Sequence, residues 1–242
     1  MPVNTSPVSN SAFAPSAPRL STFPRQTLPK QLEQLYQERA SRGEASPSLI
    51  NYAAGLSIPL HSQHLYIICS GIVQLHTIHA DGNETIVGLC GPSMVFGATL
   101  THLHPYWATA LSDTELLPLA IADVESSPAL SAALLPQVIR RLQQSEAWLA
   151  FSGKRLVVDR LRCLILQLAQ DFGQVGPNGV RITVRLTHHQ LATIIGTTRV
   201  TVTRLLRDFK SEGWLKVYRR YLIVTPQSLG MPMAGEPIVH SA

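Results

Sequence analysis

The sequence has few cysteines and no long uninterrupted apolar run. Its three cysteines, Cys69, Cys90 and Cys163, are far apart, and each lies among apolar neighbours, which favours buried, reduced thiols in a cytoplasmic protein. There is no CxxC pair and no cysteine cluster, so neither a zinc site nor an iron–sulfur centre is expected. No apolar run reaches the roughly 18 residues that a membrane-spanning helix needs, so no contact with a membrane is expected.

The chain also lacks the patterns of an enzyme and of an ordered N-terminal segment. No nucleophile–base pair, phosphate-binding loop or paired carboxylates stand out, so we do not expect an enzyme. Residues 1–30 contain no acid and are rich in Pro, Ser, Ala and Asn, which predicts a flexible tail over 1–31. A transit peptide is disfavoured, because two arginines among prolines make a poor amphipathic helix. A short helix is expected over 31–42.

Charge is distributed unevenly along the chain. Residues 1–153 hold seven Lys/Arg and ten Asp/Glu, a net charge of −3. Residues 154–242 hold thirteen Lys/Arg and five Asp/Glu, a net charge of +8. A basic half of this kind is typical of contact with the phosphates of double-stranded DNA.

From Leu49 to about Ala122, short apolar runs separated by turns predict a β-roll, within an effector or sensor domain expected over 32–126. Asp81-Gly82 is a tight-turn signal between two of these runs. Six histidines fall in this region without the fixed spacing of metal ligands, so we expect scattered surface histidines rather than a metal site. The strand candidates are Leu65–Cys69, Ile72–Ile78, Thr85–Leu89 and Thr114–Ile121.

A long helix and a hinge are expected over 127–153. Ser127-Pro128 is a helix start, and an apolar stripe close to coiled-coil spacing follows. This stripe suits a dimer seam, although packing against the roll would also explain it. Pro136 interrupts the pattern, so we expect the regular helix to begin only after it. Ser152-Gly153 is the candidate hinge.

Residues 154–228 predict a winged helix-turn-helix, with a C-terminal tail over 229–242. A helix from about Arg155 to Phe172 ends at Gly173, and a strand follows at Val180–Val184. Trp214–Tyr218 and Tyr221–Val224 form a hairpin that turns at Arg219-Arg220. Two arginines at a hairpin tip can meet phosphates, which orient the protein without reading bases.

Between the strand and the hairpin, the segment 187–212 reads as two short helices joined by a tight turn. Thr187 and Gln190 form a capping-box pattern, and Gly196 suits a turn that needs positive φ. Arginines and threonines remain for the outer face of the second helix, where guanidinium groups suit guanine and methyl groups suit thymine. The expected DNA-contact residues are Thr187, His188, His189, Thr197, Thr198, Arg199, Val200, Thr201, Thr203, Arg204, Arg207, Arg219 and Arg220.

The order of a β-roll, a long helix, a hinge and a winged helix-turn-helix resembles the Crp-Fnr superfamily of transcription regulators. The string from Ile195 to Leu206 is similar, almost letter for letter, to the recognition motif of the cyanobacterial global nitrogen-control regulators. The resemblance covers roughly 49–225. It implies an α+β fold with an N-terminal antiparallel β-roll like a cyclic-nucleotide-binding domain, a dimerisation helix and a C-terminal winged helix-turn-helix.

The resemblance also implies which DNA sequence is read. Members that bind TGTGA half-sites have a glutamate directly after the first recognition arginine. Here that residue is Val200, as in the nitrogen branch, whose half-sites are similar to GTA. Valine cannot accept a hydrogen bond from cytosine N4 but can touch a thymine methyl. The expected site is GTA–N8–TAC, bound by a homodimer that recruits or blocks RNA polymerase.

For the effector, the resemblance implies 2-oxoglutarate, bound between the roll and the long helix. However, the loop over 101–106 is shorter than in the family, and the second arginine expected there is absent. Arg141 is therefore equally well explained as a solvated or dimer-seam residue. The residues at family effector positions are Phe96, Gly97, Ala98, Thr99, Arg141 and Glu146, with His104 as the nearest polar substitute for the missing arginine.

Other effectors are disfavoured, and two alternatives to a nitrogen regulator remain. The acid and the Arg-Ser pair of cAMP binders are missing, and His76 or His102 alone is weak support for haem. One alternative is the same fold in the control of another nutrient, such as sulfur, with a different effector or none. A sensing module that acts through protein contacts is the other alternative.

Overall fold

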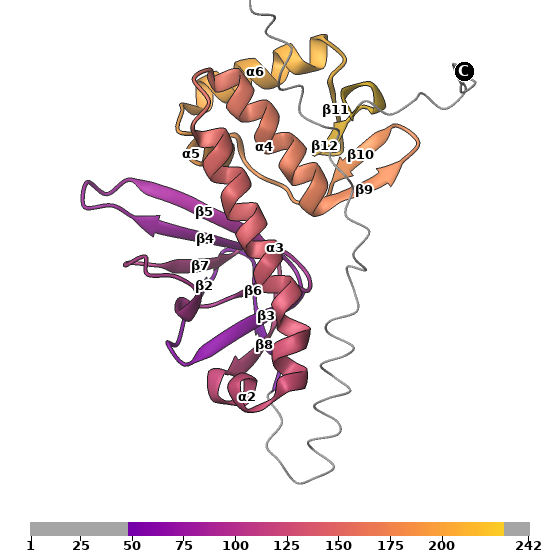
Figure 1. Ribbon diagram of the computed structural model, residues 1–242. Coiled ribbons are helices and arrows are strands. Elements are labelled where there is room, and N and C mark those ends of the chain that lie inside the picture. Colours follow the sequence, from indigo (N-terminus) through magenta and orange to yellow (C-terminus); the bar gives the residue numbers. More distant parts are fainter. Residues whose placement is uncertain (1–47, 230–242) are drawn as a thin grey trace, which may run out of the picture.

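The computed structural model describes residues 48–229. The expected tail over 1–31, the helix over 31–42 and all but the first residue of the tail over 229–242 lie outside this part. In the described residues an antiparallel β-roll is followed by a long helix, α3 (Pro128–Ser152), and by a helical unit with a small sheet (Figure 1). The expected α+β architecture is confirmed.

The roll consists of two four-stranded antiparallel sheets, in the orders β1-β8-β3-β6 and β2-β7-β4-β5. Each of the four strand candidates from the sequence corresponds to an observed strand. The four remaining strands are short, and their sequences carry no alternating pattern long enough to predict them. The bounds are β1 (Ile50–Tyr52), β2 (Ser57–Ile58), β3 (His64–Ser70), β4 (Val73–Ile78), β5 (Glu84–Cys90), β6 (Val95–Phe96), β7 (Trp107–Ala110) and β8 (Thr114–Ala120).

Strand β3 is apolar on both faces because both are covered. Tyr66 and Ile68 point into the roll, where the ring of Tyr66 stacks on Phe96 with centroids 5.4 Å apart. Leu65 and Ile67 belong to a second cluster that includes residues of α3. The alternation of a strand therefore distributes one apolar run between two cores.

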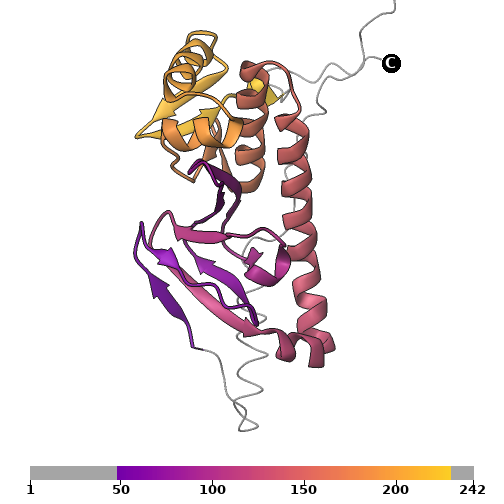
Figure 2. The same ribbon diagram turned by 90° about the vertical axis from the view of Figure 1, so that its left-hand side faces the viewer.

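Helix α3 stands along one side of the roll and reaches the C-terminal unit (Figure 2). A short helix, α2 (Ile121–Ser126), precedes it, and Ser127 caps α3 by accepting a hydrogen bond from the amide of Leu130. The expectation that the regular helix begins after Pro136 is wrong, because α3 runs through that residue without a break. Leu130 and Leu134 pack on the outer face of the roll, and this burial offsets the hydrogen bond that proline removes.

The C-terminal unit has helices α4 (Val157–Phe172), α5 (His188–Ile195) and α6 (Arg199–Ser211) and a sheet ordered β11-β12-β10-β9. The strands are β9 (Gly173–Gly176), β10 (Gly179–Ile182), β11 (Leu215–Tyr218) and β12 (Tyr221–Val224). The hairpin of β11 and β12 is confirmed. Strand β9 was not predicted from the sequence. Gly173 ends α4 as expected, but β9 begins at the same residue, so no turn separates the strand from the helix.

One core joins the roll to the C-terminal unit. Ile86 and Leu89 of β5 pack with Trp148 and Phe151 of α3 and with the buried residues of α4, α5 and α6. A hydrogen bond of 3.0 Å from Gln190 Nε2 to Gln74 Oε1 adds a polar contact between α5 and β4. The helix-turn-helix is therefore packed directly against the roll.

Candidate nucleic-acid interface

The first helix of the motif, α5, begins with the expected capping box. Thr187 Oγ1 accepts a hydrogen bond from the Gln190 amide, and Gln190 Oε1 accepts one from the Thr187 amide. Gly196 ends α5 with φ of 62°, a left-handed conformation that favours glycine. Leu191, Ala192 and Ile195 are buried, so α5 is fixed at both ends and along its inner face.

The second helix, α6, is amphipathic and presents a polar face to solvent. Thr198 caps it by accepting from the Thr201 amide at 3.2 Å. Val202, Leu205 and Leu206 form the buried stripe. Val200 lies on the opposite side and is 78 % exposed, although it is apolar. Arg199, Thr203, Arg204 and Arg207 are also exposed.

The structure brings part of α5 onto the same surface. His188 Nδ1 lies 2.8 Å from Thr203 Oγ1, and Thr203 Oγ1 also donates to the Arg199 carbonyl. His189 is exposed on α5, and Thr197 is half-buried in the turn. A shallow hollow of about 640 Å³ lies along this face. Its lining residues are His188, Arg199, Val200, Thr203, Arg204, Leu206, Arg207 and Lys210.

Lys210, which was not among the expected DNA-contact residues, also lines this hollow. It lies seven residues after Thr203 on the same helix, so helical periodicity alone would have placed it there. Burial, with Lys210 and then Arg199, lowers the pKa of His188. In addition to burial, two cations on this face therefore oppose protonation of His188.

The wing carries the two expected arginines at its tip. Tyr218 pairs with Tyr221, so Arg219 and Arg220 form a two-residue turn with φ of 48° and 70°. Positive φ at both central positions is typical of a type I′ turn, in which Asn-Gly is the favoured pair. Two arginines in this conformation indicate that the turn is not optimised for stability alone.

The effector candidates do not all meet at one place. Phe96 is part of the roll core, and Gly97 leads into a short 3-10 helix (Ala98–Leu100), in which Thr99 is exposed. His104 lies exposed in the shortened loop, and Glu146 is exposed on α3. Of the polar candidates, only Arg141 is turned into the interior.

Arg141 is held by neutral groups between α3 and the roll. It donates to Gln144 Oε1 and hydrogen-bonds Tyr106. Its guanidinium lies so close to Gly88 that a Cβ there would be 2.5 Å from Arg141 Nη1. Burial raises the pKa of Tyr106, and Arg141 partly opposes this rise.

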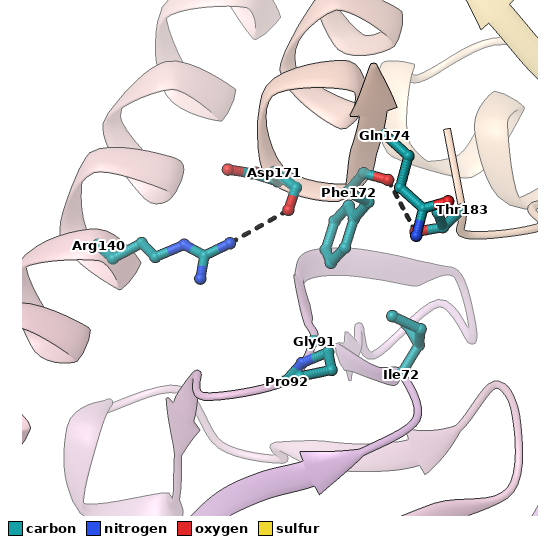
Figure 3. A pocket seen from close by; sticks show the side chains of 8 residues that line it. All are labelled: Ile72, Gly91, Pro92, Arg140, Asp171, Phe172, Gln174 and Thr183. Carbon is teal, nitrogen blue, oxygen red and sulfur yellow. Dashed lines mark hydrogen bonds between the residues drawn. The ribbon is translucent and has the colours of Figure 1, made fainter. Parts of the chain in front are cut away.

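Gln144, which the sequence analysis missed, is the centre of a buried network at the junction of the three parts. It is 2 % exposed, and its Nε2 donates to the Leu89 carbonyl at 3.0 Å and to Asp171 Oδ2 at 2.9 Å. Beside it, Arg140 donates to the Asp171 carbonyl at 3.2 Å, across a cavity of about 180 Å³ (Figure 3). No periodic signal distinguishes Gln144 from its exposed neighbour Gln143.

The part of the chain that the structure describes contains no group of side chains that could hold a metal ion. Among residues 48–229 no three His, Cys, Asp or Glu side chains gather to hold a metal ion. Cys90 is buried, whereas Cys69 and Cys163 are only partly so, and none of the three is in a disulfide. No helix over the same range is long and apolar enough to cross a membrane.

Comparisons with known proteins match both halves of the chain. The family model of the cyclic nucleotide-binding domain matches residues 61–126, and that of the Crp-like helix-turn-helix domain matches residues 159–230. The Global nitrogen regulator of Synechocystis sp. is 33 % identical over 172 residues, covering 67 % of this chain and 76 % of that protein. The Regulatory protein CysR of Synechococcus elongatus is 32 % identical over 179 residues, covering 72 % and 83 %.

Solved structures share the fold. A cyclic nucleotide-binding domain containing protein from Listeria monocytogenes superposes with a TM-score of 0.69 at 17 % identity. The match covers 81 % of this chain and 99 % of that one.

Proposed function

Because this chain belongs to the Crp family of transcription regulators, which bind DNA and are not enzymes, we propose that it reads a GTA–N8–TAC palindrome as a homodimer. The observation that carries the proposal is the outer face of α6. There Val200 stands exposed between Arg199 and Thr201, next to Arg204. Arginines suit guanine O6 and N7, and the valine suits a thymine methyl.

The exposed side of α3 supports the dimer. Leu135, Leu142 and Leu149 recur every seven residues and are 58 %, 58 % and 75 % exposed, with Ile139 between the first two. Heptad spacing of this kind buries its apolar stripe against a second helix. Leu134 packs inward on the roll instead, so one helix serves both interfaces. Two α6 helices about one DNA turn apart would then read the two half-sites.

A specificity exchange tests the reading of DNA. Fluorescence anisotropy would measure the Kd for duplexes with GTA–N8–TAC and with TGTGA half-sites at one salt concentration. Arg204→Ala should weaken binding to the first duplex by about 1–3 kcal/mol per half-site. Val200→Glu should weaken binding to the GTA duplex and strengthen binding to the TGTGA duplex, because a carboxylate accepts from cytosine N4.

The controls separate base reading from mere attraction to phosphate. Val200 is exposed, so Val200→Ala removes only the methyl contact and should weaken the GTA duplex without favouring TGTGA. The proposal is refuted if Arg204→Ala leaves the Kd of the GTA duplex unchanged. Equal binding of both duplexes by the wild type, without linear dependence of log affinity on log salt, would instead favour a module that acts through protein contacts.

We further propose that a small carboxylate controls this activity, with 2-oxoglutarate as the first compound to test. Arg141 is bound to the neutral groups of Gln144 and Tyr106, and a carboxylate is a stronger partner for a guanidinium. Calorimetry with 2-oxoglutarate, followed by operator titrations with and without it, checks the assignment. No heat and no change in Kd would reject 2-oxoglutarate and leave another nutrient signal, as for a sulfur regulator.

The proposed DNA binding also suggests that the protein acts on transcription by RNA polymerase. A dimer bound to a promoter in the cytoplasm would recruit or block RNA polymerase and so control nutrient genes of the nitrogen type. Transcription from a GTA–N8–TAC promoter with purified polymerase, with and without the protein, measures this directly. An unchanged transcript level at saturating protein would contradict it.

A further inference from the structure

A second cavity, separate from the effector region, lies beneath the recognition helix. It has a volume of about 250 Å³ and is enclosed by α4, β10, α5, α6 and the wing. Of its eleven lining residues eight are apolar, and none is acidic. The apolar ones are Leu168, Ile182, Val184, Leu186, Leu191, Leu206, Val217 and Leu222.

The remaining three lining residues are all basic and solvent-exposed. His188 comes from α5, Lys210 from the last turn of α6 and Arg220 from the tip of the wing. Leu168, Ile182 and Leu206 are buried, whereas Val217 is exposed. The cavity thus has an apolar floor and a basic mouth, contributed by three separate elements.

The mouth of the cavity suits an anion, because three basic side chains and no acidic one line the cavity. Burial, and after it the repulsion from Lys210 and Arg199, lowers the pKa of His188. A bound anion would relieve this repulsion. Apolar walls with a few convergent charged groups are typical of small-molecule sites.

We propose that this cavity binds a small amphiphilic carboxylate, with its hydrocarbon part among the leucines and its carboxylate between Lys210 and Arg220. A cavity of about 150 Å³ holds benzene, so the observed 250 Å³ accommodates a chain of about eight carbons. Longer chains would extend past Val217 into solvent. An acid without a chain, such as acetate, would leave the apolar floor empty.

Occupation of the cavity would oppose DNA binding. His188 also lines the hollow on the recognition face, and Arg220 lies at the wing tip. A carboxylate held between α6 and the wing neutralises charge that the phosphates would otherwise meet. This consequence rests on the proposed function, whereas binding of the carboxylate itself does not.

Calorimetry of the full chain with octanoate tests the site. Octanoate should bind, whereas acetate and 1-octanol should bind at least about tenfold more weakly, because each lacks one half of the interaction. Lys210→Gln should weaken octanoate about tenfold by removing one charge-assisted hydrogen bond. Lys216→Gln, on the neighbouring strand β11 but outside the lining, is the matched control and should leave the Kd unchanged.

A cavity-filling variant gives an independent check. Leu222→Trp places an indole in the cavity while keeping all three basic residues, so it should abolish octanoate binding. If Leu222→Trp fails to fold by circular dichroism, Lys210→Gln decides alone, because Lys210 is exposed. Absence of heat with wild-type protein overturns the proposal, as does an equal loss in Lys210→Gln and Lys216→Gln.

The effect on DNA is measured separately. Octanoate should raise the Kd of wild-type protein for the GTA duplex and leave that of Lys210→Gln nearly unchanged. If octanoate binds but the duplex is not recognised without it, the proposed function fails and the site stands. If the duplex is recognised and octanoate gives no heat, the site fails and the proposed function stands.

Discussion

Replacing the turn residues Arg219-Arg220 with Asn-Gly should make the protein more stable and weaken its binding to DNA. Both arginines have positive φ, which costs a residue with a side chain roughly 1–2 kcal/mol. Arg219 recovers part of this, since its guanidinium lies 5.3 Å from the ring centroid of Tyr218 and such exposed pairs contribute about 0.5–1 kcal/mol. The double variant Arg219→Asn, Arg220→Gly should therefore raise the free energy of unfolding by about 1–3 kcal/mol.

The same variant should lose phosphate contacts. A dimer has two wings, so four cationic side chains disappear from the complex. The slope of log affinity against log salt changes by about 0.9 per phosphate contact, so it should become shallower by roughly 3.6. Urea unfolding gives the first quantity, and anisotropy on the GTA duplex at several salt concentrations gives the second.

The matched control keeps both the charge and the backbone strain. Arg219→Lys, Arg220→Lys should have a salt slope close to wild type and no gain in stability. Two results would contradict the prediction: an Asn-Gly variant that is less stable than wild type, or one with an unchanged salt slope. The first would show that the turn is not strained, and the second that the wing does not meet phosphate.

Three further perturbations address the junction, the roll and the seam. Gln144→Leu should lower the free energy of unfolding in urea by about 1–3 kcal/mol, because buried partners lose their hydrogen bonds, whereas Gln143→Leu should change it little. Burial, opposed in part by Glu84, lowers the pKa of His76 in the folded protein. Below about pH 6.5 the unfolded chain therefore binds more protons than the folded one, and the free energy of unfolding falls as the pH drops towards the folded pKa. His76→Gln should reduce this loss of stability. Leu142→Glu should shift the dimer to monomer in sedimentation experiments and weaken operator binding.

The recognition helix was predictable because its signals are local. The capping box of Thr187 and Gln190 and the left-handed Gly196 act within one or two helical turns, so no distant contact is needed to place α5 and α6. Val200 was singled out from the resemblance rather than from these local signals, and the structure places it 78 % exposed on α6. Short-range hydrogen bonds and helical periodicity thus explain why this segment could be interpreted residue by residue.

Pro136 and Arg141 show where local reasoning fails. The helix passes through Pro136 because Leu134 is buried against the roll, which is a contact between segments distant in sequence. Arg141 was given two roles, as a carboxylate ligand or as a solvated or seam residue. Its actual partners, Gln144 and Tyr106, follow from how α3 lies on the roll, which no sequence pattern encodes.

The contacts that join the roll to the helix-turn-helix also connect residues that are far apart in the sequence. Gln190 completes the capping box of α5 and also donates to Gln74, which is 116 residues away in the chain; Gln74 in turn donates to Glu84 at 2.8 Å. The start of the helix-turn-helix is therefore bonded to the β4–β5 hairpin of the roll. Gln190, Gln74 and Glu84 are not among the expected DNA-contact residues, and Thr187, which is bonded to Gln190, caps α5 and does not lie on α6. We therefore expect substitutions in the roll to change the proposed control without altering the bases that α6 is proposed to read.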